Sequence, residues 1–295
     1  MIDRIVNTKN MKEANVVLLS APYENGVSFM GGTSKAPKKI LNCLNSNLEL
    51  FDVELHCEPA KILKTVYKEI SNLKKLAPSM AVKKISSEYH KLLNNGKFVI
   101  MLGGEHTVSF GALEAISKKE NPSDITILQI DAHQDLRSDS SDYSEKKEKF
   151  AHSCVMRRIH ELGFNIVQVG IRTYSKYEYE YWQKNKKTIT VFEWNKKEIP
   201  ISKILKSIKT KKIYITVDVD GFDPAYMPGT GTPVQSGLNW YYGLDLIEKA
   251  IDQKELVGAD IVEVSPQRDS VLTEFGAAFI CYKIMTHKFK KKLLS

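Results

Sequence analysis

Seven short runs of apolar, largely β-branched residues recur along the 295-residue chain, and helical periodicity separates several of them. The runs are 16–20, 98–102, 125–130, 166–169, 189–192, 213–217 and 261–264, and the helical periodicity is found over 62–73 and 82–92. Strands that are apolar on both faces and alternate with helices are typical of a mostly parallel sheet covered by helices. The sequence therefore predicts a single α/β domain over residues 1–295.

The composition narrows the class of protein. With 42% apolar residues the chain can bury a sizeable core, and it has no apolar run near the roughly 20 residues that cross a bilayer. Residues 1–16 lack the apolar segment of a signal peptide, so we expect a cytoplasmic protein that does not enter a membrane. The cysteines show no C-x-x-C spacing, which favours reduced thiols over a zinc knuckle or a disulfide framework.

The formal net charge of +8 does not by itself indicate a nucleic-acid partner. The lysines are spread along the chain, and their main cluster, 288–292, lies at its C-terminal end. No surface that combines clustered basic and aromatic residues can be read from the sequence. We interpret the lysines as a solvated surface and expect no nucleic acid as a partner.

Four of the apolar runs end in or lead into polar, chemically active side chains. The segments are VIMLGGEHT, ILQIDAHQD, YITVDVDGFDP and DIVEVSP, and the side chains are His106, Asp131, His133, Asp135, Asp218, Asp220 and Glu263. In open parallel sheets, ligand sites lie beyond the carboxyl ends of the strands. We therefore expect these side chains to converge on one crevice.

Such a cluster of acids and imidazoles points to metal ions. If extended geometry continues past residue 130, Asp131, His133 and Asp135 share one face of the chain. Four crowded carboxylates repel one another unless cations compensate them. Six oxygen and nitrogen ligands suit two ions about 3.5–4 Å apart, and the absence of thiolates favours manganese over structural zinc. Two bridged ions that share a water are typical of metal-assisted hydrolysis.

Each motif alone has a simpler interpretation. A single D-x-D is commonly a turn or cap pair, and a single G-G-x-H is commonly a strand-to-helix turn. His152 alone is more typical of a surface or hydrogen-bonded histidine. The metal hypothesis depends on the conjunction, because every motif follows an apolar run and together they provide the ligands of a dinuclear site.

The motifs GGEHT, DAHQD and VDVDGFDP, in this order and at wide spacing, resemble those of the ureohydrolase family, which includes arginases and agmatinases. The resemblance covers nearly the whole chain. It implies an arginase-like, three-layer α/β/α sandwich with a mostly parallel central sheet, formed by a single ureohydrolase domain over 1–295. It also implies two manganese ions (Mn²⁺) as cofactors.

The resemblance assigns a role to each candidate ligand. It implies that Asp131 and Asp218 bridge the two ions. His106 and Asp135 would complete the ligands of one ion, and His133 and Asp220 those of the other. His152, in FAHSCVMRRI, matches the family's proton-shuttling histidine. Glu263, in DIVEVSP, matches the glutamate that binds the substrate guanidinium.

The charge of such a site favours a cationic substrate. Four carboxylates cancel two divalent ions, and a hydroxide plus Glu263 leave the site about two units negative by formal count. The implied mechanism has hydroxide, oriented by Asp135, attack the guanidinium carbon. The metals and Glu263 would stabilise the tetrahedral intermediate, and His152 would help to protonate the departing amine.

Several segments are more similar to agmatinases than to arginases. They are Leu136-Arg137, His152-Ser153-Cys154, Arg157-Arg158-Ile159, EVSP together with DPAYMPGTGTP, and LTEFGAAFICYKI. Three segments depart from the agmatinase pattern: residues 234–237, which read VQSG in place of E-P-G-G, the stretch GGTSKAPKKI, which lacks R-F-G-P, and the long charged stretch 138–149. Agmatine, cleaved to urea and putrescine, is the predicted substrate.

Other substrates remain open, because the departures border the expected pocket. The alternatives are arginine, guanidinobutyrate, a guanidino acid of the formiminoglutamate type, or a polyamine derivative. An acid substrate would need a cation for its carboxylate, which Arg137 or a lysine of 146–149 would supply. The free ammonium of agmatine would favour Asp139 or Asp142. We expect residues 138–149 to form an exposed insertion.

A second class of function is a metal-binding regulatory protein without catalysis. It is disfavoured because all six candidate ligands, His152 and Glu263 are present, whereas a single missing residue usually accompanies the loss of catalysis. The resemblance also implies a homo-oligomer, a trimer or a hexamer.

Overall fold

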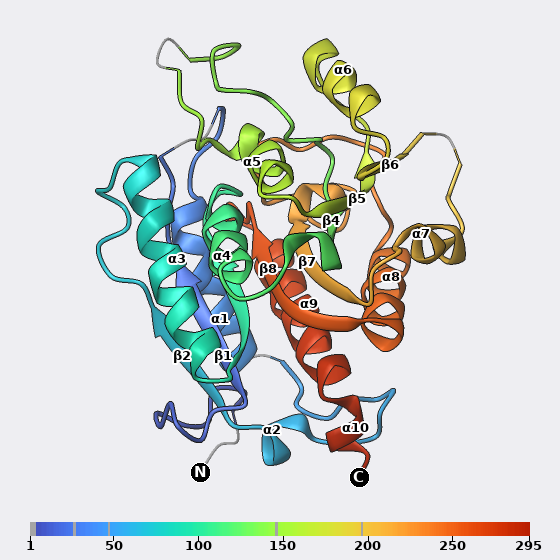
Figure 1. Cartoon of the computed structure of the whole chain (residues 1–295). Helices are drawn as coiled ribbons and strands as arrows, with labels where there is room; N and C mark the ends of the chain where they lie inside the picture. The colour runs from blue at the N-terminus through green and yellow to red at the C-terminus, as the bar shows by residue number, and fades with distance from the viewer. Residues whose placement is uncertain (1–3, 26–27, 47, 145–146, 196) are drawn as a thin grey trace.

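The computed structural model describes residues 4–25, 28–46, 48–144, 147–195 and 197–295 (Figure 1). Within them, eight parallel strands form one sheet in the order β2-β1-β3-β8-β7-β4-β5-β6. The strands are β1 Val16–Ala21, β2 Thr65–Glu69, β3 Phe98–Gly103, β4 Ile125–Ile130, β5 Asn165–Ile171, β6 Ile189–Glu193, β7 Lys212–Asp218 and β8 Glu255–Val262.

Helices cover both faces of this sheet. The α-helices are α1 Ala36–Ser46, α2 Pro59–Ile62, α3 Pro78–Asn94, α4 Val108–Ser117, α5 Val155–Glu161, α6 Lys176–Lys184, α7 Ile201–Ser207, α8 Trp240–Gln253, α9 Leu272–Lys288 and α10 Lys290–Leu293. Short 3-10 helices are η1 Thr33–Lys35, η2 Pro122–Asp124, η3 His152–Cys154 and η4 Val219–Gly221. No helix in the described part of the chain is long and apolar enough to span a membrane.

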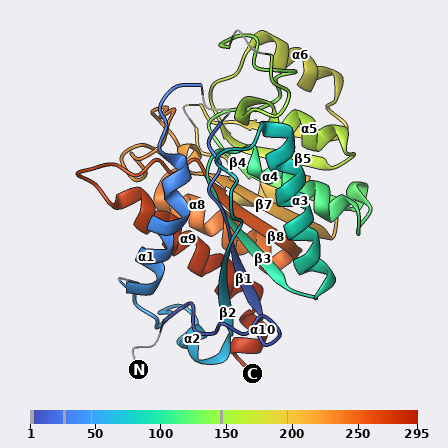
Figure 2. The same cartoon turned by 90° about the vertical axis from the view of Figure 1, so that its left-hand side faces the viewer.

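Two apolar clusters, one on each face of the sheet, make this a three-layer α/β/α sandwich, as predicted. One cluster packs the sheet against α1, α8 and α9, and the other packs it against α3, α4 and α5 (Figure 2). In β1, Leu18 belongs to the first cluster, whereas Val17 and Leu19 belong to the second. Because successive strand residues point to opposite faces, fully buried strands must be apolar throughout. Each buried leucine contributes roughly 1.5–3 kcal/mol.

Six of the seven predicted strands agree closely with the structure, and the seventh, 261–264, overlaps only the end of β8, which begins six residues earlier. The helix predicted over 62–73 is wrong. In its place the short α2 precedes β2, which pairs with β1 from Val16↔Thr65 to Ser20↔Glu69. Val66 and Ile70 are both buried, and their spacing of four residues matches a helix by chance. Val66 lies in the edge strand β2, and Ile70 directly follows it. The helical prediction over 82–92 is confirmed by α3.

The four motif-bearing strands are neighbours at the centre of the sheet. In the order β3-β8-β7-β4, their carboxyl ends lie side by side at one edge, where the loops that follow them emerge. Figure 1 shows these loops at the upper end of the strands. The topology therefore brings segments more than a hundred residues apart in sequence to one place.

Candidate metal and catalytic site

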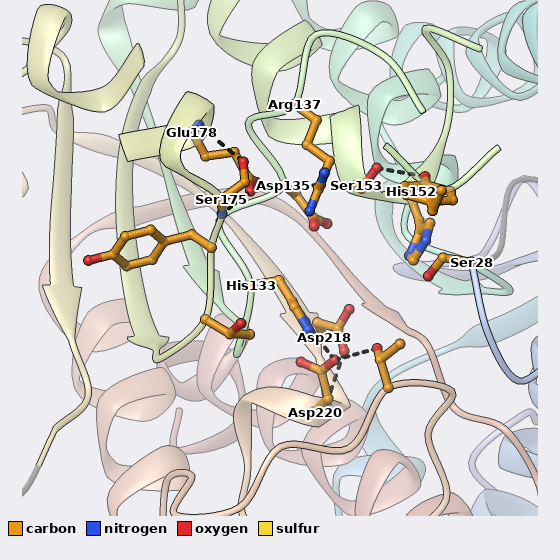
Figure 3. A pocket seen from close by; sticks show the side chains of 14 residues that line it. Ser28, His133, Asp135, Arg137, His152, Ser153, Ser175, Glu178, Asp218 and Asp220 are labelled. Atoms are coloured by element: carbon orange, nitrogen blue, oxygen red, sulfur yellow. Dashed lines mark hydrogen bonds and ion pairs between the residues drawn. The ribbon is translucent and has the colours of Figure 1, made fainter. Parts of the chain in front are cut away.

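A cavity of about 290 Å³ opens at the carboxyl edge of the sheet (Figure 3). Its walls come from the loops after β4, β5 and β7, from η3 and from Ser28. The described lining residues are Ser28, His133, Asp135, Arg137, Tyr143, His152, Ser153, Thr173, Tyr174, Ser175, Glu178, Asp218, Asp220 and Thr232. Figure 3 shows His133, Asp218 and Asp220 close together on one side of it, with Arg137 and His152 above them.

One group of potential ligands centres on His106, which is completely buried. Its Nδ1 lies 3.2 Å from Asp131 Oδ2, 3.2 Å from Asp135 Oδ2 and 3.4 Å from Asp218 Oδ2. Ligand atoms of His106, Asp131 and Asp135 all lie within 4.8 Å of one another. An imidazole nitrogen aimed at three carboxylate oxygens has the donor set of a divalent transition-metal site.

A second group shares Asp131 with the first. His133 Nδ1 lies 3.0 Å from Asp220 Oδ2 and 3.5 Å from Asp131 Oδ1, and ligand atoms of the three residues lie within 4.8 Å of one another. Asp131 thus presents Oδ2 to one group and Oδ1 to the other. A carboxylate with one oxygen in each of two ligand groups fits a bridge between two ions.

The structure brings Asp131, His133 and Asp135 together, but not by the predicted extended geometry. β4 ends at Ile130, and Asp131 Oδ1 accepts a hydrogen bond of 2.6 Å from the backbone N–H of His133, which turns the chain. Asp135 has φ +54°, in the left-handed region that disfavours most residues. The regular strand is therefore not continued: the backbone N–H of His133 is taken by a side chain, although Asp131 N–H still donates to Val169 O at 3.0 Å and His133 forms an isolated parallel bridge with Thr173.

Crowding and burial shift the pKa values of the acidic groups. Burial and the neighbouring Asp131 raise the pKa of Asp135 to about 7. Burial and Asp220 raise the pKa of Asp218 well above its usual range. Burial alone would also raise the pKa of Asp131, but hydrogen bonds from His106 and His133 hold it below that range. This electrostatic conflict is what bound cations would relieve.

Glu263 and His152 lie beside the metal-ligand groups. Glu263 directly follows β8, has φ +62° and accepts a hydrogen bond of 2.7 Å at Oε1 from the backbone N–H of His106. His152 Nδ1 lies 3.7 Å from the same oxygen, and its buried Nε2 has no hydrogen-bond partner among the described residues. Burial and the charges of His133 and His106 lower the pKa of His152 to about 3. His152 lines the cavity, whereas Glu263 lies behind it and is not among the described lining residues.

The described residues of the stretch 138–149 pack partly onto the site rather than forming a wholly exposed insertion. Ser140 is buried, and Tyr143, which lines the cavity, hydrogen-bonds Ser153 Oγ through its hydroxyl at 2.7 Å. Arg137 forms an ion pair with Asp142. Asp139 is partly buried, accepts from the backbone N–H of Ser141 at 2.9 Å and is not among the described lining residues. Residues 145 and 146, including the Lys146 considered above, lie outside the described residues.

Several supporting residues were missed by sequence reasoning. Gln129, inside β4, donates a hydrogen bond of 2.7 Å to Asp131 Oδ2, and Gln168, inside β5, donates in turn to Gln129. Both are completely buried. The available signal was a glutamine inside each of two otherwise apolar strands, because a buried amide needs a polar partner.

Comparisons with known proteins agree on one family. A family model described as Arginase family matches residues 14–287. The chain belongs to the arginase family. It is 33% identical over 282 residues to N(1)-aminopropylagmatine ureohydrolase of Synechocystis, which spans 92% of this chain and 89% of that protein. It is also 31% identical over 268 residues to agmatinase of Bacillus subtilis, which spans 90% and 88% respectively.

Solved structures show the same arginase-like architecture. The crystal structure of agmatine ureohydrolase of Thermoplasma volcanium superposes with a TM-score of 0.84 at 28% identity, over 99% of this chain and 97% of that one. This arginase-family protein is a ureohydrolase of the agmatinase-like branch, a hydrolase of guanidino carbon–nitrogen bonds. Arginase-family enzymes depend on two metal ions, and the two ligand groups that share Asp131 fit that requirement.

Proposed function

We propose that this protein hydrolyses agmatine to urea and putrescine with two Mn²⁺ ions. The observation that carries the proposal is the pair of ligand groups sharing Asp131, with the buried carboxylate of Glu263 next to them. The metal ligands would be His106, Asp131, His133, Asp135, Asp218 and Asp220. When bound, two ions supply a water nucleophile that is activated near neutral pH.

Three side chains would act on the substrate. Glu263, a buried carboxyl group beside the metal ligands, would bind the guanidinium as its anion and orient its carbon. Asp135, which lines the cavity, would orient the attacking water by accepting its hydrogen bond. His152 would protonate the departing amine, because its ring reaches the cavity and its Nε2 has no described partner.

The charge around the cavity supports an amine rather than an acid at the far end of the substrate. Among the described lining residues, Arg137 is the only arginine, and none is a lysine. Its guanidinium is neutralised by Asp142 and lies 3.8 Å from Glu178 Oε2. A substrate carboxylate would therefore find no free cation there, whereas an ammonium would meet a site rich in carboxylates. This favours agmatine over arginine, guanidinobutyrate or formiminoglutamate.

N(1)-aminopropylagmatine is a second candidate substrate. The Synechocystis relative that covers most of this chain carries the name of that activity. The compound keeps the guanidino group and adds a second cationic amine, so the charge argument applies equally to it. The difference from agmatine lies in length, which affects only the part of the substrate farthest from the metals.

The organisation of the protein is also proposed. A single domain over 1–295 is supported by the family match to 14–287 and by the one continuous sheet. A cytoplasmic homo-oligomer, trimer or hexamer, would follow the family pattern. Light scattering after size-exclusion chromatography measures the assembly directly.

A urea-release assay tests the function. Purified, Mn²⁺-loaded protein is incubated with agmatine, N(1)-aminopropylagmatine, arginine and guanidinobutyrate, and formamide release is followed for formiminoglutamate. Agmatine is expected to give the highest kcat/KM. Turnover of arginine but not agmatine would refute the proposed substrate.

A variant separates the hydrolase from a regulatory metal-binding protein. Asp131→Asn is expected to lose Mn²⁺ binding and urea release together, because one residue contributes to both ligand groups. If the variant bound Mn²⁺ normally and the natural protein cleaved no guanidino compound, the regulatory alternative would replace the hydrolase.

A further inference from the structure

A chain of buried hydrogen bonds leads away from the metal site into the sheet. His106 Nε2 lies 2.9 Å from Thr216 Oγ1, and Thr216 Oγ1 lies 2.6 Å from Asp260 Oδ1. The hydroxyl of Tyr214 donates to Asp260 Oδ2 at 2.7 Å. All four side chains are completely buried, and none but His106 belongs to the groups discussed above. A buried carboxylate inside an apolar strand requires an explanation.

The sheet register positions this chain. Thr216 in β7 and Asp260 in β8 are paired residues of neighbouring parallel strands, and Tyr214 lies two residues before Thr216 on the same face. Gly258, two residues before Asp260, provides space, since a Cβ there would clash with the Tyr89 hydroxyl and crowd the Tyr214 ring. The carboxylate of Asp260 is therefore held by rigid strands rather than by a loop.

The direction of the hydrogen bonds follows from the chemistry of the groups. An ionised carboxylate only accepts, so Thr216 donates its single hydroxyl hydrogen to Asp260. The Thr216 oxygen must then accept from His106, which places the imidazole hydrogen on Nε2. A metal-binding imidazole must be neutral, and in a neutral ring with its hydrogen on Nε2 the lone pair is on Nδ1, the atom that faces Asp131, Asp135 and Asp218.

We propose that Asp260, acting through Thr216, is a positioning residue that fixes the His106 tautomer required for metal binding. The arrangement is a carboxylate–histidine–metal relay with a threonine hydroxyl inserted between carboxylate and ring. Such outer partners orient the ligand and raise its basicity. The inference rests on the proposed metal site but not on the identity of the substrate.

The alternative is that the hydrogen bonds between Asp260, Thr216 and His106 run in the opposite donor–acceptor direction. If Asp260 carried a proton, it would donate to Thr216, Thr216 would donate to Nε2, and Nδ1 would hold the hydrogen instead. Burial raises the pKa of Asp260 above its usual value, and the nearby His106 and hydrogen bonds from Thr216 and Tyr214 offset only part of this rise. Each carboxylate oxygen already accepts from a different hydroxyl, which is the pattern expected of the anion.

Manganese titration of metal-stripped protein tests the relay. In Thr216→Val, which keeps the shape but removes the hydroxyl, and in Asp260→Asn, the affinity for one of the two ions is expected to fall 10- to 100-fold. The other ion should bind within about threefold of its normal affinity, because His133 and Asp220 are untouched. Thr216→Ser, which restores the hydroxyl, should recover both affinities. Wild-type binding by both Thr216→Val and Asp260→Asn would overturn the proposal.

Tyr214→Phe is the matched control. It removes one hydrogen bond to Asp260 but leaves the link from Asp260 to Thr216 and His106 in place. Manganese affinity should stay within about threefold, while the melting temperature falls. Equal weakening in Tyr214→Phe and Thr216→Val would indicate general loosening of the sheet and would also overturn the proposal.

A measurement on the unaltered protein avoids any folding defect. In ¹⁵N-histidine-labelled protein loaded with diamagnetic Zn²⁺, the His106 ring should carry its hydrogen on Nε2. A hydrogen on Nδ1 would refute the relay. If the protein bound two ions and His106 had the Nε2 tautomer but no urea were released, the proposed function would be refuted and the relay would stand.

Discussion

At the scale of single residues, Glu263 has an unfavourable backbone conformation that holds its carboxyl group beside the metal ligands. Its φ of +62° is costly for a residue with a Cβ, and its carboxylate is almost fully buried. Burial and the charge of Glu105 raise its pKa well above the usual range. A bound guanidinium would compensate that charge, so the same group would provide both affinity and orientation.

Replacing Glu263 by glutamine tests this role. The amide keeps the shape but not the charge, so kcat/KM for agmatine should fall about 100-fold, which corresponds to about 2.7 kcal/mol. Steady-state kinetics measure the loss, and the manganese content should remain two ions per chain. A variant that kept normal kcat/KM would remove Glu263 from the substrate-binding site.

The sequence was most informative where a polar residue follows an apolar run. His106, Asp131 and Asp218 could be predicted because strand ends of a parallel sheet share one edge. The left-handed conformation of Asp135 could not be predicted, since it depends on long-range bonds such as that from the Arg157 N–H to its carbonyl at 3.1 Å. The threonine–aspartate relay also depends on strand register, which the sequence alone does not fix.

At the scale of elements, one arginine joins the segment after β5 to the long loop after β7, the two strands on either side of β4. Arg172, directly after β5, donates to the carbonyls of Asp220 and Val234 at 2.6 Å each and to that of Gly170 at 2.9 Å. The guanidinium thus fixes the backbone of a proposed metal ligand and the long loop beyond it. A planar group with five donors is suited to several carbonyls at once.

Arg172→Met should loosen both loops. It leaves half-buried carbonyls without donors, and we expect a loss of about 3 kcal/mol in the free energy of unfolding, since hydrogen bonds to charged groups contribute roughly 1.5–3 kcal/mol each. Urea denaturation measures the change, and manganese affinity should fall with it. The stability of Arg172→Lys, which has fewer hydrogen-bond donors than arginine, should lie between that of the natural protein and that of Arg172→Met. Unchanged stability in Arg172→Met would show that water replaces the donors.

The loop over 138–149 offers a test of substrate charge. In Asp142→Asn the Arg137 guanidinium loses its partner at the cavity. The KM for agmatine should rise about three- to tenfold, and the KM for guanidinobutyrate should fall if it is turned over at all, because exposed ion pairs have modest effects. Parallel kinetics with the two substrates provide the comparison. An increase in both KM values would mean that the loop had moved instead.

The wrong prediction of a helix over residues 62–73 also has its cause in the pairing of elements. Apolar residues at 62, 66, 70 and 73 match a helix, and an edge strand needs few of its residues buried. With only five residues, β2 is too short to show a clear alternation of apolar and polar residues. Pairing with β1, which supplies the hydrogen bonds, is a non-local cause that the local pattern cannot contain.

At the scale of the whole molecule, a buried ion cluster joins the chain's early and late parts. Lys283 of α9 is only 2% exposed, and its Nζ lies 2.7 Å from Glu54, 3.3 Å from Asp52 and 3.3 Å from Glu248 of α8. Burial alone would lower the lysine pKa, but these carboxylates raise it. The cluster therefore links the segment before α2 to the helices behind the sheet.

Lys283→Met should destabilise the fold without changing the chemistry of the site. Removing one partner of a buried pair leaves uncompensated carboxylates, at a cost of about 3–5 kcal/mol. Because the folded pKa is raised, the lysine's contribution is complete below its ordinary pKa of 10.5 and is lost as pH rises through the folded value. Denaturation curves at pH 8 and above 10.5 should show the gap between the two proteins narrowing. Since none of these residues lines the cavity, kcat per folded molecule should stay within twofold, and a larger fall would place the cluster in communication with the site.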